Sequence, residues 1–124
     1  MAEQRVRILV VDDDADVRLV LRRMLEGAGH EVIEAPNGKA AMAECRSQPV
    51  DLMITDIFMP EQEGMETISQ VRREYPHLKI IAVSGQTSAL YLKMTKLLGA
   101  QATLEKPLRM EKVLETVKEV LGCR

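Results

Sequence analysis

The amino-acid sequence predicts a single α/β domain, built as a doubly wound parallel sheet of five strands with five helices. Short apolar runs alternate with segments in which apolar residues recur every three or four positions. This alternation fills a chain of 124 residues, which is an ordinary length for one domain. Strands that alternate with helices pair in parallel through right-handed crossovers, so helices cover both faces of the sheet.

Apolar runs mark the expected strands. Val, Ile and Leu predominate in them, as in strands that are buried on both faces. The run at 31–35 alternates charged and apolar residues instead, which is typical of an edge strand. In chain order, the expected strands cover 6–11, 31–35, 51–55, 79–83 and 102–104.

Helical periodicity marks the segments between these strands. Asp14 is a suitable N-cap for the first helix, Gly27 or Gly29 ends it, and Gly99 ends the fourth. Asn37–Gly38 indicates a turn before the second helix. The expected helices cover 14–27, 39–46, 65–74, 87–98 and 110–121. The residues expected to face the core are Val17, Val20, Leu21, Met24 and Ala28 in the first helix, Leu90, Met94, Leu97 and Leu98 in the fourth, and Met110, Val113, Leu114, Val117, Val120 and Leu121 in the last.

Composition narrows the classes of function. Aromatic residues make up 2% of the chain against 46% for all hydrophobic residues, so we expect an aliphatic core. The formal net charge of −2 gives no electrostatic basis for direct nucleic-acid contact. Cys45 and Cys123 lack metal-ligand spacing and are expected to be unpaired thiols. No apolar run reaches the ~18 residues of a membrane span, and no signal-peptide pattern precedes the first run. We therefore expect a cytoplasmic protein with no membrane contact.

Polar and charged residues follow four of the expected strands. Asp12 and Asp13 come after the first strand, Asp56 after the third, Ser84 after the fourth and Lys106 after the fifth. The carboxyl ends of parallel strands meet at one edge of a sheet, and ligands bind in the crevice there. Three carboxylates, one hydroxyl and one ammonium at one edge predict a site for a divalent cation and a phosphoryl group.

The aspartates near the first strand divide into two groups. Asp14 and Asp16 fit the N-terminus of the following helix, where negative charge is stabilised. Asp12 and Asp13 directly follow a buried run, and together with Asp56 they would repel one another without a cation. Mg²⁺ prefers oxygen ligands and commonly takes one or two carboxylates plus a substrate phosphate. We therefore expect Mg²⁺ at Asp12, Asp13 and Asp56.

Charge assigns a role to each remaining residue. Asp56 is the candidate nucleophile, because a carboxylate can attack phosphorus and form an aspartyl-phosphate. Lys106 and the hydroxyl of Ser84 would each take a phosphoryl oxygen, since a transferring phosphoryl group spreads its negative charge over its oxygens. Taken singly, each residue also has an ordinary explanation as a turn former, a helix cap or a solvated lysine. The prediction therefore depends on the whole set.

Short motifs occur in a fixed order along the chain. Residues 8–14 read Ile-Leu-Val-Val-Asp-Asp-Asp, residues 56–60 read Asp-Ile-Phe-Met-Pro with Gly64 following, and residues 83–85 read Val-Ser-Gly. Gly99–Ala100 is then followed by Lys106–Pro107. With this set of motifs, the chain resembles a response-regulator receiver domain of two-component signalling, from about residue 5 to residue 121, with no second domain expected.

The resemblance implies a flavodoxin-like sheet with strand order 2-1-3-4-5 and Mg²⁺-dependent transfer of a phosphoryl group to Asp56. The donor would be a phosphohistidine on a sensor histidine kinase or phosphotransfer protein. Asp12 and Asp13 match the metal-binding acidic pair, and the backbone carbonyl of Phe58 would be a further ligand. Lys106 matches the family's lysine, and the hydroxyl of Ser84 matches the one that reorients toward phosphate. The chain would then be a phosphoacceptor rather than a turnover enzyme.

One position departs from the family's pattern. The aromatic residue that usually switches lies three residues before the lysine, and here that residue is Thr103. A ring that moves inward with Ser84 therefore cannot report phosphorylation. Either Thr103 moves a little, or the output surface is coupled differently. We expect the change on activation to concentrate in the Ser84 loop and at the start of the fourth helix.

Other functions fit the sequence less well. A phosphatase of the haloacid-dehalogenase type also forms an aspartyl-phosphate, and Asp12 with Asp14 superficially fits its motif. However, position 16 lacks the Thr or Val expected there, and a chain of this length has no room for a cap domain. Val17 and Arg23 stand where a calcium loop needs Gly and Glu. A docking domain that is never phosphorylated would not need the whole set of five residues. The downstream partner, either a separate protein or an output domain fused in a longer chain, is left open.

Overall fold

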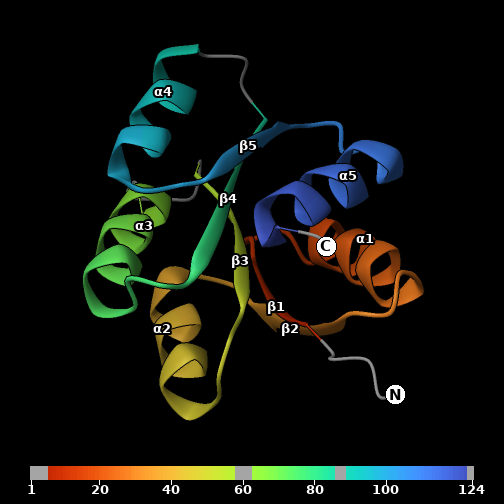
Figure 1. The fold of residues 1–124 in the computed structure, drawn as a ribbon, viewed down its shortest axis with the longest axis horizontal. Helices are drawn as coiled ribbons and strands as arrows, with labels where there is room; N and C mark the ends of the chain where they lie inside the picture. Colours follow the sequence, from red (N-terminus) through yellow and green to blue (C-terminus); the bar gives the residue numbers. More distant parts are fainter. Residues whose placement is uncertain (1–5, 58–62, 86–88, 123–124) are drawn as a thin grey trace.

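The computed structural model describes residues 6–57, 63–85 and 89–122, and these form a three-layer α/β fold (Figure 1). Phe58, one of the residues implied by the resemblance, lies outside these ranges, as does Cys123. In chain order the elements are β1 (Arg7–Val11), α1 (Ala15–Gly27), β2 (Glu31–Ala35), α2 (Gly38–Ser47), β3 (Leu52–Asp56), α3 (Glu63–Glu74), β4 (Lys79–Ser84), α4 (Ala89–Leu98), β5 (Ala102–Glu105) and α5 (Met110–Leu121).

The strands form one parallel sheet in the order β2-β1-β3-β4-β5, as expected for a flavodoxin-like fold. Helices α1 and α5 cover one face, while α2, α3 and α4 lie on the other (Figure 1). Strand β2 is at an edge of the sheet, as its alternating sequence predicted. Both the fold class and the strand order are therefore confirmed.

Alternate residues of the central strands point into two separate aliphatic cores. Leu9 and Val11 of β1 belong to the core beneath α2 and α3, where Ile68 is fully buried. Ile8 and Val10 belong to the core beneath α1 and α5. Burying both faces of β1 fixes its register, because a slip by one residue would exchange the two sets of side chains.

The helix ends follow the capping chemistry of the sequence. The Asp14 side chain accepts a hydrogen bond from the backbone N–H of Asp16, as the predicted N-cap should. Asn37 does more than form a turn, since its side chain accepts from the N–H of Ala40 and makes Asn37 the N-cap of α2. Gly99 follows α4 with a φ of 125°, a conformation that residues with a Cβ atom rarely adopt.

Three predicted helix faces were partly wrong. In α1, Leu21 and Leu25 are the buried residues, whereas Val20 is 45% exposed, because the face toward the sheet is turned away from Val20 and toward Leu25. Ala28 is exposed because it lies at the C-cap, beyond the helix.

In α4, Thr95 is fully buried and Leu98 packs against the core. Within the described side chains of this helix, Met94 and Leu97 face solvent instead of the core. Similarly, Met110 at the start of α5 is 54% exposed.

The amino-terminal edge of the sheet is held by Arg72 of α3. Its guanidinium donates hydrogen bonds to the carbonyl oxygens of Pro76 at 2.8 Å, Leu78 at 2.9 Å and Gly99 at 2.7 Å. It also contacts Oε1 of Gln101 at 3.3 Å. One side chain thus ties the end of α3 to the start of β4 and the end of α4.

No helix in the described ranges is long and apolar enough to cross a membrane.

We predict that Arg72→Ala lowers the free energy of unfolding by about 2 kcal/mol, because charge-assisted hydrogen bonds to three carbonyl groups are lost together. Urea unfolding, followed by circular dichroism, measures this change. The matched control is Arg73→Ala, since Arg73 is exposed and forms no ion pair with a described residue. Equal losses in the two variants would contradict the role of Arg72.

Candidate functional site

The five predicted site residues all lie at the carboxyl-terminal edge of the sheet. Asp12 and Asp13 follow β1, Asp56 and Ser84 are the last residues of β3 and β4, and Lys106 follows β5. Backbone pairing holds this edge together. Parallel pairing sets Asp56 opposite Val83 of β4, and the N–H of Lys106 donates to the carbonyl of Ser84 at 2.8 Å.

Three carboxylates converge at this edge. Oxygen atoms of Asp12, Asp13 and Asp56 all lie within 4.8 Å of one another. Asp12 is 2% exposed and Asp56 is 4% exposed, whereas Asp13 faces solvent. Two of the three charges are thus almost fully buried, which is costly without compensation. The open side at Asp13 leaves a route from solvent to the cluster.

Lys106 brings a positive charge to the two buried carboxylates. Its Nζ lies 3.2 Å from Oδ2 of Asp12 and 3.5 Å from Oδ2 of Asp56. Burial lowers the pKa of Lys106, but the charges of Asp56 and Asp12 outweigh it, so the pKa is raised above its ordinary value. Lys106 therefore remains an ammonium group at neutral pH. Its peptide bond to Pro107 is cis.

Asp12 is fixed in position by three neighbours besides Lys106. Its Oδ1 accepts a hydrogen bond from the N–H of Asp14 at 2.9 Å. Its backbone N–H donates to the carbonyl of Ala35, and its backbone carbonyl accepts from Arg18 at 2.6 Å. Arg18 also pairs with Glu34 of β2 at 3.0 Å. The backbone of Asp12 is thus held by α1 and β2, and its side chain is oriented by Asp14 and Lys106 before any ligand arrives.

Glu34 is the anchor of a second charged group beside the site. Arg22 lies 2.6 Å and Arg18 3.0 Å from its carboxylate oxygens. The hydrogen bond from Arg22, with a smaller one from Arg18, lowers the pKa of Glu34 below its ordinary value despite partial burial. Sequence analysis missed this group: Arg18 and Arg22 are four residues apart in the predicted helix, but nothing in the sequence identified Glu34 as their partner.

The donor set fits a divalent cation. Three carboxylates against one ammonium leave two negative charges uncompensated in a partly buried cluster. Every donor is an oxygen atom, which is what Mg²⁺ prefers over softer ligands. Waters can complete the coordination from the exposed side at Asp13, in keeping with the reluctance of Mg²⁺ to lose its waters.

Ser84 and Thr103 lie on the two strands next to the acidic cluster, β4 and β5. Ser84 is 1% exposed at the end of β4, so its hydroxyl lies inside the edge rather than in solvent. Thr103 of β5 is half-buried and lines a surface cavity of about 540 Å³ that extends to Arg109 and Lys112 at the start of α5. Residue 103 itself carries no ring, whereas the family pattern has an aromatic residue at this position.

Gly64 allows α3 to approach the site. A Cβ atom at this position would clash with the carbonyl oxygen of Asp56 and lie 2.6 Å from Cα of Ile57. The start of α3 is therefore in direct contact with the backbone that carries Asp56. The hydroxyl of Thr55 donates to the same Asp56 carbonyl at 3.1 Å, which further fixes this turn.

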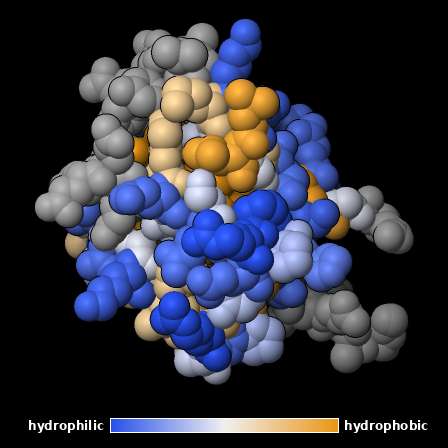
Figure 2. Space-filling model, turned by 90° about the vertical axis from the view of Figure 1, so that its left-hand side faces the viewer, coloured by the Kyte–Doolittle hydropathy of each residue, from blue (hydrophilic) through white to orange (hydrophobic). Residues whose placement is uncertain are grey.

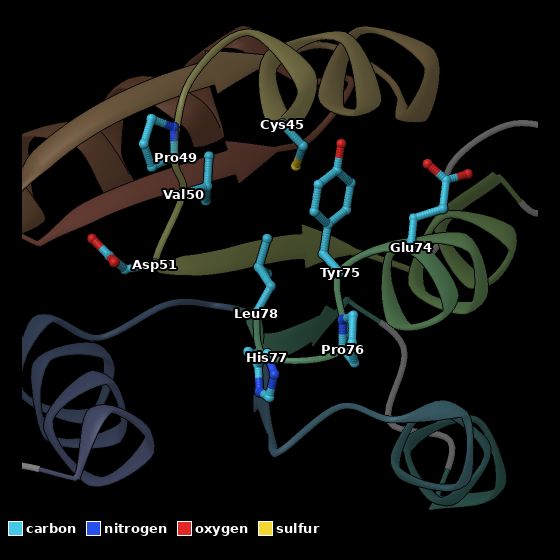
Figure 3. A pocket seen from close by; sticks show the side chains of 9 residues that line it. All are labelled: Cys45, Pro49, Val50, Asp51, Glu74, Tyr75, Pro76, His77 and Leu78. Carbon is cyan, nitrogen blue, oxygen red and sulfur yellow. The ribbon is translucent and has the colours of Figure 1, made fainter.

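A separate cavity of about 480 Å³ lies at the opposite edge of the sheet, near the start of β3 and β4 (Figure 3). Cys45, Tyr75 and Leu78 point toward its interior (Figure 3). Cys45 is a free thiol, and burial raises its pKa, so it is poorly reactive. None of the five predicted site residues lines this cavity. It is therefore not part of the acidic site.

Comparison with solved structures supports the fold. The chain matches a CheY-like response regulator receiver domain from Methanospirillum hungatei with a TM-score of 0.90 and 31% sequence identity, covering 96% of this chain and 95% of that one. The fold is thus that of the CheY-like flavodoxin class.

Sequence comparison identifies the family. The family model of the response regulator receiver domain matches residues 8–118. The chain is 34% identical to the chemotaxis protein CheY of Thermotoga maritima over 116 residues, which is 92% of this chain and 96% of CheY. It is also 33% identical to the transcriptional regulatory protein ZraR of Klebsiella oxytoca over 122 residues, but spans 28% of the length of ZraR. The chain belongs to the response regulator receiver domain family of two-component signalling.

We predict that Gly64→Ala lowers the free energy of unfolding by about 1–3 kcal/mol, because the added methyl group must push α3 away from Asp56 and Ile57. Gly27→Ala is the control: nothing lies within 4 Å of a Cβ atom there, and the change should stabilise α1 slightly. Urea unfolding of both variants measures the difference. A Gly64→Ala variant as stable as the parent would show that α3 approaches less closely.

Proposed function

We propose that this receiver domain accepts a phosphoryl group on Asp56, with Mg²⁺ held by Asp12, Asp13 and Asp56. The observation that supports it best is the convergence of three carboxylates within 4.8 Å, with the ammonium of Lys106 3.5 Å from Asp56. Phosphoryl transfer needs a nucleophile together with fixed positive charge for the phosphoryl oxygens. This edge of the sheet supplies both in one place.

The proposed donor is a phosphohistidine on a sensor histidine kinase or a phosphotransfer protein. One oxygen of Asp56 forms a bond to phosphorus while the phosphorus–nitrogen bond of the donor breaks. The electron pair of the broken bond stays on the imidazole nitrogen. Asp56 is almost fully buried and its Oδ2 lies 3.5 Å from Nζ of Lys106, so its carboxylate is held in place before the donor arrives.

Other residues of the edge stabilise the charge that develops. Bound Mg²⁺ would neutralise negative charge on one phosphoryl oxygen. Lys106 would exchange its contact with Asp56 for a second oxygen, and the hydroxyl of Ser84 would donate to a third. The backbone carbonyl of Phe58 is a further proposed ligand. Water then attacks the phosphorus, the bond to the Asp56 oxygen breaks, and inorganic phosphate leaves. The same groups would assist this resetting, so the domain is proposed to be a phosphoacceptor and not a turnover enzyme.

An apolar surface borders the site where a phosphohistidine carrier would have to approach. A shallow cavity of about 240 Å³ beside Lys106 is lined by apolar atoms of Val17, Val20, Pro107 and Leu108. Val20 is 45% exposed although it is aliphatic. A helix of the carrier packed here would bring its histidine next to Asp56, with the charged side chains of Asp16 and Lys106 also lining the contact.

Phosphorylation would then act as a switch for partner binding. The added charge biases a two-state element, for which we propose the loop after Ser84 and the start of α4. Thr103 is too small to act as a ring that changes sides, so little repacking is expected around it. The partner is a separate protein or an output domain of a longer chain. Residues 5–121 make up the proposed phosphoacceptor unit, which is expected to act in the cytoplasm without direct nucleic-acid contact.

The proposal predicts one phosphoryl group per chain, added at Asp56 only when Mg²⁺ is present. The protein is incubated with acetyl phosphate, with and without EDTA, and its intact mass is measured. Asp56→Asn should abolish the mass increase, because an amide cannot act as the nucleophile. The control Asp51→Asn changes an exposed aspartate outside the cluster and should label normally. Labelling that persists in Asp56→Asn would refute the assignment.

Lys106→Ala should separate phosphorylation from its consequences. The variant loses the cation that contacts Asp12 and Asp56, so the phosphorylated state should no longer draw the Ser84 segment toward the phosphoryl group. Amide spectra with and without beryllofluoride, a phosphoryl mimic, measure the response. Lys118→Ala, at an exposed lysine of α5, should respond like the parent protein. A full response in Lys106→Ala would contradict the role proposed for this lysine.

A further inference from the structure

The outer side of α4 exposes large hydrophobic residues that nothing in the fold covers. Leu97 is 87% exposed and Met94 is 39% exposed. Thr95 is fully buried and Leu98 packs on the core, so the sheet lies on the other side of the helix. Residues 94 and 97 are three apart and hence neighbours on the helix surface, forming a short apolar ridge.

This ridge lies beside a groove that α4 shares with α3. The groove has a volume of about 380 Å³ and is lined by Met65, Glu66, Ser69, Gln70, Arg73 and Leu98. Figure 2 shows the face of the molecule that carries α4 and α3. Hydrophobic side chains gather in the upper part of that face, where α4 lies, and hydrophilic ones adjoin them. Met65 and Leu98 give this groove an apolar part, while its other lining residues are polar or charged.

Positive charge borders this apolar surface. Lys93 and Lys96 of α4 and Arg73 of α3 are all exposed. None of the three forms an ion pair with another described residue. Helix α4 has no acidic residue, and Glu66 is the one acidic residue among those that line the groove. This local excess of positive charge stands on a chain whose formal net charge is −2.

We propose that the α3–α4 groove and the Met94–Leu97 ridge bind an acidic amphipathic helix of a partner protein. Apolar residues of such a helix, spaced at three and four positions, would fill the groove and cover Leu97. Its acidic residues would meet Lys93, Lys96 and Arg73, and the complementary charges would favour acidic partners over basic ones.

A second copy of this chain fits the surface less well. A symmetric contact would place the same patch on both subunits and bring lysine next to lysine. The surface is also separate from the acidic edge, since none of its residues belongs to the phosphoryl site. The proposal therefore does not depend on phosphorylation of Asp56, and its test can use the unmodified chain.

The test measures binding of synthetic helical peptides to the isotope-labelled, full-length chain by amide chemical shifts. The probe is a peptide of about four turns, ~14 residues, with leucines at helical spacing and glutamates beside them. One matched peptide replaces the glutamates with lysines, and a second replaces the leucines with serines. We expect the acidic peptide alone to bind, with shifts concentrated on the described parts of α3 and α4.

Variants of the chain then assign the contacts. Leu97→Ser should weaken binding about tenfold or more, because a Leu buried by the peptide is lost. Lys93→Glu with Lys96→Glu should abolish binding of the acidic peptide, and binding by the parent chain should weaken as the salt concentration rises. Leu19→Ser is the control, because Leu19 of α1 is 43% exposed and lies on the opposite face of the sheet. All of these positions are exposed, so the variants should remain folded.

Several outcomes would overturn the proposal. These are the absence of binding by the acidic peptide, equal binding of the basic peptide, shifts that map to α1 and α5, or equal losses in Leu97→Ser and Leu19→Ser. Sedimentation that shows a dimer of the parent chain, dissociated by Leu97→Ser, would assign the surface to self-association instead and would equally refute an acidic partner. Selective binding that is lost in Leu97→Ser and in the lysine variant would support it.

Discussion

Asp12 and Asp56 are almost fully buried next to each other, and the ammonium of Lys106 reaches both. Each carboxylate would repel the other, and a further carboxylate of Asp13 adds to this repulsion. Much of the surrounding structure serves to hold these charges in place. Strand pairing sets their backbone positions, and the absence of a side chain at Gly64 lets α3 reach the Asp56 backbone. The fold thus holds the site together with more negative than positive charge, which suits it to bind a cation.

At the opposite edge of the sheet, hydrogen bonds from Arg72 hold the backbone in place. Arg72 fixes the end of α3, the start of β4 and the end of α4 through backbone carbonyls. A change that starts at Ser84 would therefore meet a fixed point at the far end of α4. Thr103, half-buried beside an open cavity, gives no large side chain that could carry such a change across β5. The two observations together favour a response concentrated at the start of α4.

Local chemistry made most of the fold and the convergence of the site predictable. Short apolar runs such as 79–83, which alternate with helical segments, predict buried parallel strands. The carboxyl ends of parallel strands meet at one edge, so Asp12, Asp56 and Lys106 were expected to lie together. Helix faces were less predictable. In α4 the polar Thr95 is buried, whereas the hydrophobic Leu97 is exposed, so hydrophobicity alone points to the wrong face. The partners of Arg18 and Arg72 could not be found at all, since they depend on side-chain reach and on which carbonyls the packed helices leave available. The same limit explains why an exposed ridge on α4 became visible only in the structure.

The central claim is that the acidic cluster is a cation site whose charge the fold leaves uncompensated. The most direct measurement is the free energy of unfolding as a function of Mg²⁺ concentration, at constant ionic strength, for the parent chain and Asp13→Asn. Because a ligand that binds only the folded state stabilises it, stability should rise by about 1.4 kcal/mol for each tenfold increase in Mg²⁺ above the dissociation constant. Asp13 is exposed, so its substitution should leave the fold intact while raising the dissociation constant, which moves the rise to higher Mg²⁺ concentrations and makes it smaller at any given concentration. Stability that does not change with Mg²⁺ in the parent chain, or that rises equally in Asp13→Asn, would contradict the account.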